Sequence, residues 1–259
     1  MTAAPTAERR QLRYGMFDVP LLWAGRGRPL LFLHGAWGLL GGWGPHSHLA
    51  RLAEHYLVLA PSHPGFDGAT GLEHLDDVLD LTLYYLDFLD ELMLDSPYLV
   101  GHGFGAMIAA EMAALAPQRI AKVVLVAPYG LWLEGAPIAD VFAMTPDELE
   151  QALWYNPSAA TPFDQSPEAR VQRAQNLAAA AKFLWPIPDR GLRKRLHRLL
   201  APTLLVWGER DRIVPLVYGE AFHQRIPNSR LLTIPGAGHV PQVEQPHAFA
   251  RTVLEFLEG

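Results

Sequence analysis

Short, uninterrupted apolar runs recur along the chain, and each has the length of a β-strand. They lie at residues 29–33, 56–60, 97–100, 122–126, 203–207 and 230–234. Continuous rather than alternating hydrophobicity is typical of strands that are buried on both faces of a parallel sheet. The pattern therefore predicts a parallel sheet with other elements packed on both of its sides.

Segments with helical spacing separate these runs. Residues 72–94 place leucine and valine at steps of three and four, and residues 104–116 are rich in alanine and methionine. Residues 249–257 form a closing amphipathic pattern. Alternating strands and helices predict βαβ units, whose right-handed crossovers put helices on both faces of the sheet. The stretch from Gln11 to Trp23 predicts an antiparallel hairpin joined to one edge.

Residues 131–190 interrupt this alternation. They contain no evident strand, but tryptophan and phenylalanine gather there and proline recurs throughout. We interpret the segment as a helical cap inserted over the sheet. The chain would then consist of a core, residues 1–130 and 191–259, and a cap, residues 131–190. The alternative is an ordinary extra pair of helices with buried aromatic side chains.

Composition narrows the class of protein. The 259 residues are 50% hydrophobic and 19% charged, which suits one large domain with an insertion. A net charge of -6 argues against a nucleic-acid partner, and the absence of cysteine excludes disulfides and thiolate chemistry. No secretion signal is evident at the start, and no apolar run reaches the ~18 residues of a membrane span. We expect a soluble, cytoplasmic protein that does not enter membranes.

A glycine-rich turn follows the run at 97–100. Residues 101–105 read Gly-His-Gly-Phe-Gly and lead into the helical pattern of residues 104–116. Small residues at both ends suit the tight G-x-S-x-G elbow, which lifts a nucleophilic side chain and aims the amides of the next helix at negative charge. Here the central residue is Gly103, which has no side chain. The turn lacks the Lys-Ser/Thr of a P-loop and is too short for a dinucleotide fingerprint.

Two later motifs complete the pattern. Residues 207–215 read Trp-Gly-Glu-Arg-Asp-Arg-Ile-Val-Pro after one run, and residues 235–241 read Pro-Gly-Ala-Gly-His-Val-Pro after the last run. With the turn at 101–105 they stand in the order nucleophile, acid, histidine. On these motifs the chain resembles the α/β-hydrolase superfamily, in particular carboxylesterases and carbon–carbon bond hydrolases with a helical cap. The resemblance extends over nearly the whole chain.

The resemblance implies the fold and the roles of the site residues. It implies an α/β-hydrolase fold with a mostly parallel, eight-stranded sheet, helices on both faces and a helical cap. Asp211 would orient His239, which would act as the base. The motif His-Gly-Ala-Trp after the first run resembles the oxyanion loop. The amide of Ala36 or Trp37 would therefore pair with the amide of Phe104.

Each motif also has a purely structural interpretation. Asp211 could cap a turn, with Glu209 sharing the role of the acid, and His239 could be a hydrogen-bonded loop histidine. His34 and His102 flank the site and fit structural hydrogen bonds better than the role of a base or a metal ligand.

A missing nucleophile leaves three hypotheses open. The chain could be a serine hydrolase in which Gly103 replaces the serine. It could instead be an enzyme in which His239 and Asp211 activate water or deprotonate the substrate without a serine. It could also be a hydrolase-like protein that binds a ligand without turnover.

The aromatic residues of segment 131–190 point to a small, hydrophobic ester or other carbonyl compound as the substrate. The residues expected to contact it are His34, His102, Phe142, Met144 and Val240. No phosphate-binding fingerprint and no metal-ligand spacing of histidine and carboxylates is present, so no cofactor and no metal is expected.

Overall fold

A computed structural model describes residues 4–39, 43–157, 166–187, 189 and 191–259. Its strands are β1 (Thr6–Leu12), β2 (Phe17–Ala24), β3 (Pro29–Leu33), β4 (Leu57–Pro61), β5 (Tyr98–His102), β6 (Lys122–Val126), β7 (Thr203–Gly208) and β8 (Ser229–Ile234). Its α-helices are α1 (His48–Leu52), α2 (Val78–Glu91), α3 (Phe104–Leu115), α4 (Pro146–Leu153), α5 (Pro167–Leu184), α6 (Val217–His223), α7 (Pro241–Glu244) and α8 (Pro246–Glu258). Short 3-10 turns connect several of these elements.

The eight strands form one sheet in the order β1-β2-β4-β3-β5-β6-β7-β8. β2 pairs antiparallel with both β1 and β4, and all the remaining pairs are parallel. This arrangement confirms the predicted fold class, including the antiparallel hairpin at one edge. The hairpin begins at Thr6, earlier than predicted, because the exposed polar side chains of β1 gave no apolar run.

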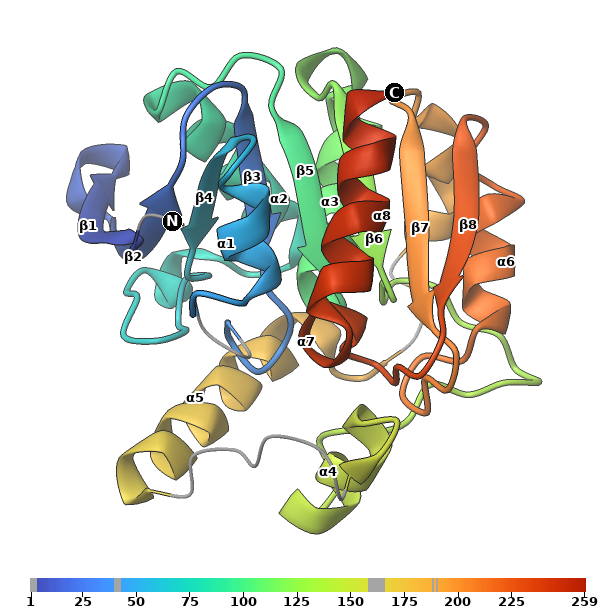
Figure 1. The fold of residues 1–259 in the computed structure, drawn as a ribbon. Helices are drawn as coiled ribbons and strands as arrows, with labels where there is room; N and C mark the ends of the chain where they lie inside the picture. Colours follow the sequence, from blue (N-terminus) through green and yellow to red (C-terminus); the bar gives the residue numbers. More distant parts are fainter. Residues whose placement is uncertain (1–3, 40–42, 158–165, 188, 190) are drawn as a thin grey trace.

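Helices cover both faces of the sheet, with α1 and α8 on one side and α2, α3 and α6 on the other (Figure 1). Successive residues of each parallel strand enter opposite cores. In β3, Leu31 and Leu33 pack on the α3 side, whereas Leu30 and Phe32 pack on the α8 side. Burying one such side chain contributes about 1.5–3 kcal/mol. This two-sided burial explains why these strands read as continuous apolar runs.

One predicted helix is shorter than its pattern. Residues 72–94 predicted a single helix, but α2 begins at Val78 because the side chain of Asp77 caps it, accepting hydrogen bonds from the amides of Leu79 and Asp80 at 2.8 and 3.1 Å. Before this cap the chain forms a short 3-10 turn at Leu72–His74.

α4 and α5 lie beyond the end of the sheet at which the parallel strands finish, apart from the helices that cover its faces (Figure 1). Both belong to the predicted cap segment, of which positions 158–165, 188 and 190 lie outside the described residues. No helix among the described ranges combines the length and the apolarity that a membrane crossing requires.

Candidate active site

The turn between β5 and α3 has the backbone of a nucleophile elbow. Gly103 adopts φ 53° and ψ -110°, and α3 begins at the next residue. The amide of Gly103 donates to the carbonyl of Val126 at 2.8 Å, and its carbonyl accepts from the amide of Tyr129 at 3.3 Å. These bonds fix the turn against the end of β6.

The three glycines of this turn differ in the space around them. A Cβ on Gly101 would lie 2.6 Å from the Cα of Ala106, and a Cβ on Gly105 would lie 2.2 Å from the carbonyl oxygen of Leu33. A Cβ on Gly103 would meet nothing closer than Nε2 of His239 at 3.5 Å and Cε2 of Tyr129 at 3.6 Å. Close packing therefore requires glycine at 101 and 105, whereas position 103 has room for a small side chain that points at His239.

His239 and Asp211 form a buried, hydrogen-bonded pair. Nδ1 of His239 lies 2.8 Å from Oδ2 of Asp211, and neither side chain is exposed to solvent. The other carboxylate oxygen of Asp211 accepts the amides of Ile213 and Val214, both at 2.9 Å. This arrangement assigns the ring proton to Nδ1, so that Nε2 carries the lone pair of a base.

Glu209 does not share this role. Its carboxylate accepts the amide of Gly236 at 3.0 Å and is exposed.

Within the described chain, Nε2 of His239 is buried without a hydrogen-bond partner, and the same holds for Nε1 of Trp37 and the hydroxyl of Tyr129. The rings of Trp37 and Tyr129 lie edge-on to that of His239, with centroids 5.9 and 6.2 Å away. Two aromatic side chains with unpartnered buried polar atoms therefore pack beside the ring of His239.

The loop after β3 lies against the elbow, because a Cβ on Gly105 would lie only 2.2 Å from the carbonyl oxygen of Leu33 at the end of β3. The amide of Gly38 closes this loop on the carbonyl of Gly35 at 3.2 Å, and Ala36 and Trp37 are buried within it. Phe104 is the first residue of α3, where backbone amides have no partner inside the helix. The loop after β3 and the start of α3 therefore pack together, and the role of their amides as oxyanion donors stays a prediction.

His34 and His102 are buried and bonded to the backbone. Nδ1 of His34 lies 2.8 Å from the carbonyl of Gly35, and its Nε2 accepts the amide of His63 at 3.1 Å. Nε2 of His102 lies 2.9 Å from the carbonyl oxygen of His239. Both rings therefore hold the loops of the site in position, and their contact with a substrate stays a prediction.

Four buried histidines are expected to make the fold sensitive to acid. Burial lowers the pKa of His34, His63 and His102, and it lowers the pKa of His48 to about 3. Because these values lie below the unfolded value of about 6.5, the stability gained by keeping the rings neutral is complete above that pH and is lost as the pH falls below it.

Below a pH of about 6.5, each such ring lowers the free energy of unfolding by about 1.4 kcal/mol for every unit by which the pH falls. Urea titrations at pH 7.5 and 5.5 should therefore give unfolding free energies that differ by about 2–5 kcal/mol, the lower value at pH 5.5. His48→Leu should reduce the difference by about 1 kcal/mol. An unfolding free energy that stays level or rises on acidification would contradict this prediction.

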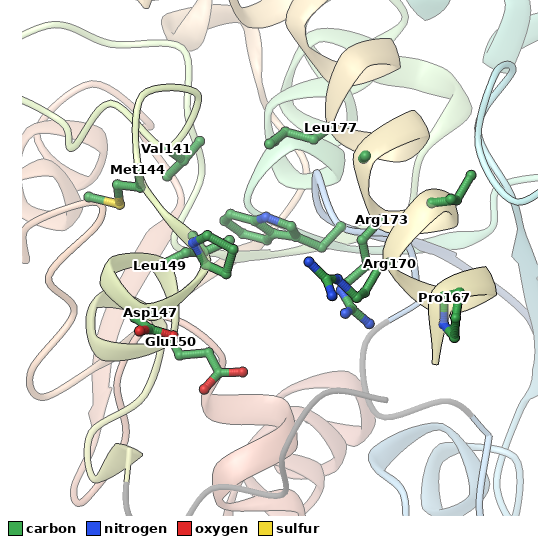
Figure 2. A pocket seen from close by; sticks show the side chains of 13 residues that line it. Val141, Met144, Asp147, Leu149, Glu150, Pro167, Arg170, Arg173 and Leu177 are labelled. Atoms are coloured by element: carbon green, nitrogen blue, oxygen red, sulfur yellow. The ribbon is translucent and has the colours of Figure 1, made fainter. Parts of the chain in front are cut away.

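A cleft of about 830 Å³ opens between α4 and α5. Figure 2 shows Leu149 and Glu150 of α4 on one side and Arg170, Arg173 and Leu177 of α5 on the other. Met144 and Trp37 also line the cleft. Trp37 links the cleft to the His239–Asp211 pair, because its ring also lies beside that of His239.

Two other residues predicted to contact substrate lie outside the lining of this cleft. Phe142 is half-buried and packs edge-on to Trp185, with ring centroids 6.0 Å apart. Val240 is fully buried in the core.

Sequence reasoning missed several residues of the site. Tyr129 packs on the elbow, but only its position just after a strand end could have indicated it. Arg170 and Arg173 line the cleft from a helix whose alanine-rich and polar sequence has no apolar stripe. Among the residues that the structure describes, no cluster of three or more histidine or carboxylate side chains is arranged to hold a metal ion.

Several known proteins resemble this chain in sequence. The profile of the alpha/beta hydrolase family matches residues 30–252. A 2-hydroxy-6-oxo-6-phenylhexa-2,4-dienoate hydrolase from Burkholderia cepacia is 30% identical, over 93% of this chain and 91% of that protein. A 2-hydroxy-6-oxononadienedioate/2-hydroxy-6-oxononatrienedioate hydrolase from Comamonas testosteroni is 28% identical, with the same shares covered.

Solved structures show the same fold. The 2-hydroxy-6-oxo-6-phenylhexa-2,4-dienoate hydrolase from Rhodococcus sp. strain RHA1 superposes with a TM-score of 0.79 at 21% identity, covering 99% of this chain and all of that one. A membrane phospholipase A superposes with a TM-score of 0.83 at 23% identity, covering 99% of this chain and 86% of that one.

Proposed function

The chain belongs to the alpha/beta hydrolase family, and on this premise we propose that it binds a small, hydrophobic ester or ketone beside Gly103. The carbonyl oxygen of the substrate accepts the amide of Phe104 and the amide of Ala36 or Trp37. His239, oriented by Asp211, is the base. The observation that carries the proposal is Nε2 of His239, buried and without a partner, 3.5 Å from the point where a side chain at position 103 would begin.

The first candidate is a serine hydrolase that lacks only its nucleophilic side chain. Nε2 of His239 lies within reach of a hydroxyl on a Cβ at position 103, and the space there admits that Cβ. The retained dyad and the two amide donors would then be the rest of an acyl-transfer site. Gly103→Ser tests this candidate, with Gly103→Ala as its matched control.

The second candidate is hydrolysis without a serine. A water molecule beside Gly103 would give its proton to Nε2 of His239 while its oxygen bonds to the substrate carbonyl carbon. The unpartnered Nε2 of His239 beside the side-chain-free position 103 supports this route, since it leaves an acceptor for the proton of a small polar molecule. His239→Ala tests this candidate.

The substrate class follows from the cleft. Its walls are largely apolar, with Val141, Met144 and Leu149 on the α4 side. The relatives from Burkholderia cepacia and Comamonas testosteroni are named as hydrolases of 2-hydroxy-6-oxo acids. We infer that an ester bond, or a carbon–carbon bond beside a ketone, is broken at the dyad while the apolar part of the substrate occupies the cleft. Residues 131–190 would then act as a cap, and the active protein would need no cofactor, metal or nucleic acid.

A larger side chain in the cleft should weaken the binding of esters with long acyl groups more than that of esters with short ones. Leu149→Trp adds a large ring to the α4 wall, so in a Gly103→Ser background the KM for p-nitrophenyl hexanoate is expected to rise by about tenfold, since two or more lost methylene contacts are worth more than 1 kcal/mol. The KM for p-nitrophenyl acetate should change by less than about twofold, because its acyl group is too short to reach the wall. Leu200→Trp, at an exposed leucine, is the control. Equal effects on both esters would exclude the cleft as the acyl site.

A further inference from the structure

The carboxyl end of α4 is bonded directly to the loop that carries His239. The amide of His239 donates to the carbonyl of Leu153 at 2.8 Å. A Cβ on the neighbouring Gly238 would lie 2.5 Å from the same carbonyl oxygen and 2.8 Å from the amide nitrogen of Tyr155. Only glycine permits this approach, which brings the backbone of the cleft wall against the backbone of the predicted base.

Glu244 joins the same two segments through its side chain. One carboxylate oxygen accepts the amide of Tyr155 at 2.7 Å, and the other accepts the amide of Gly238 at 2.6 Å. Both bonds are charge-assisted and short, and the side chain is half-buried. A single carboxylate thus spans from the residue before His239 to the chain just beyond α4.

Arg212 makes the corresponding connection to the loop that carries Asp211. Its guanidinium donates to the carbonyl of Gln151 at 2.7 Å and to that of Trp154 at 3.3 Å. These carbonyls belong to the end of α4, where a positive charge is favourable. The adjacent Arg210 lies over the ring of Tyr155, with its guanidinium carbon 5.1 Å from the ring centroid.

We propose that Glu244 and Arg212 clamp the His239–Asp211 dyad to the α4 wall of the cleft, and that Glu244 is a positioning residue for His239. The inference rests on the proposed function, because it assigns the cleft to the substrate. Leu149 and Glu150 of α4 face the cleft (Figure 2). Leu153, whose carbonyl accepts the amide of His239, lies less than two helical turns beyond them on the same helix. A displacement of these side chains would therefore also displace the backbone that holds His239.

Hydrogen bonds hold the amide, the carbonyl and the ring of His239, so a shift of α4 would move the whole residue. Its amide is bonded to Leu153, its carbonyl oxygen lies 2.9 Å from Nε2 of His102, and its ring is bonded to Asp211. Moving a catalytic group by about 1 Å can reduce a rate by about 100-fold. Loosening the clamp should therefore disturb the dyad even though Glu244 touches neither ring.

Glu244→Gln is the main variant. An amide offers one acceptor in place of two, so one of the bonds to Gly238 and Tyr155 is lost while the size of the side chain is kept. Arg212→Met is the second variant, and it releases α4 from the Asp211 loop without touching Glu244. Glu209→Gln is the matched control, because Glu209 accepts the amide of Gly236 in the same histidine loop, and this bond does not involve α4.

The first readout is the proton NMR signal of the Nδ1–H of His239, identified by its loss in His239→Ala. It reports the dyad in the chain as it exists and needs no turnover. Glu244→Gln and Arg212→Met should shift or broaden this signal, whereas Glu209→Gln should leave it in place. An unchanged signal in both clamp variants, each shown to be folded by circular dichroism, would overturn the inference whether or not the chain hydrolyses esters.

The second readout is kinetic, in a Gly103→Ser background with p-nitrophenyl butyrate. Misplacement of the base should lower kcat by about tenfold or more in Glu244→Gln while KM changes by less than about threefold. A purely structural role would lower the unfolding temperature and leave kcat per folded molecule unchanged, which contradicts the inference. If the Gly103→Ser chain has no activity at all, the first candidate function fails, but the NMR result still decides on the clamp.

Discussion

Gly103→Ser is expected to convert this chain into an ester hydrolase that works through an acyl-enzyme. The hydroxyl would lie within hydrogen-bonding reach of Nε2 of His239, which already has its proton on Nδ1 through Asp211. Removing the nucleophile of a serine hydrolase typically costs many powers of ten, so its introduction should raise kcat for p-nitrophenyl butyrate by at least about 10³-fold. Stopped-flow release of p-nitrophenol should show a burst of about one equivalent per active site.

The same substitution should weaken the fold. A serine at φ 53° is held in a backbone region that costs about 1–3 kcal/mol. Gly103→Ala carries the same backbone cost but no hydroxyl, so it should lose similar stability in urea titrations and gain no activity. A Gly103→Ser chain that is folded yet no faster than Gly103→Ala would rule out the first candidate function.

Removing the base should abolish this activity. His239→Ala in the Gly103→Ser chain is expected to reduce kcat to the level of the chain with Gly103, a loss of at least about 10³-fold, because the serine then has no proton acceptor. Asp211→Asn should cost up to about 10⁴-fold, because an amide favours the wrong tautomer of the ring. Glu209→Gln, which alters an exposed carboxylate bonded to Gly236, should leave kcat within about twofold.

In the chain with Gly103, the histidine variant separates the remaining hypotheses. Any slow hydrolysis by the dyad and a water molecule should disappear in His239→Ala and proceed without a burst in the parent chain. Hydrolysis that persists in His239→Ala at the same rate would exclude the dyad as the base. Ligand binding without turnover in the parent chain would instead support a protein that binds carbonyl compounds without acting on them.

The sequence predicts the core of the fold because the parallel strands are buried on both faces. The runs at 122–126 and 203–207 read as strands, and they are β6 and β7, each paired with a parallel strand on both sides. β1 contributes no such run, since all but one of its side chains lie outside the core and its place comes from pairing with β2. The boundary of α2 was set by the cap of Asp77, a local hydrogen bond that apolar periodicity does not report.

The candidate site, too, could be predicted from the sequence only in part. Asp211 and His239 follow neighbouring parallel strands, whose carboxyl ends lie at the same edge of the sheet. The order of the motifs along the chain was therefore enough to predict that the two side chains meet. The cleft was not predictable, because its α5 wall is made of polar residues and alanine whose contacts depend on how that helix crosses the end of the sheet. The role of Glu244 depends on the close approach of two backbones at Gly238, which no spacing in the sequence indicates.

The measurement that bears most directly on the account is labelling by a fluorophosphonate probe, which bonds covalently only to a serine activated by a neighbouring base. The chain with Gly103, Gly103→Ala and Gly103→Ser are each treated with the probe, and the adduct is located by mass spectrometry of peptides. We expect one adduct, at position 103 of Gly103→Ser, that is lost in the double variant with His239→Ala. A folded Gly103→Ser chain that takes up no probe would contradict the claim that this site is a serine-hydrolase site lacking one side chain.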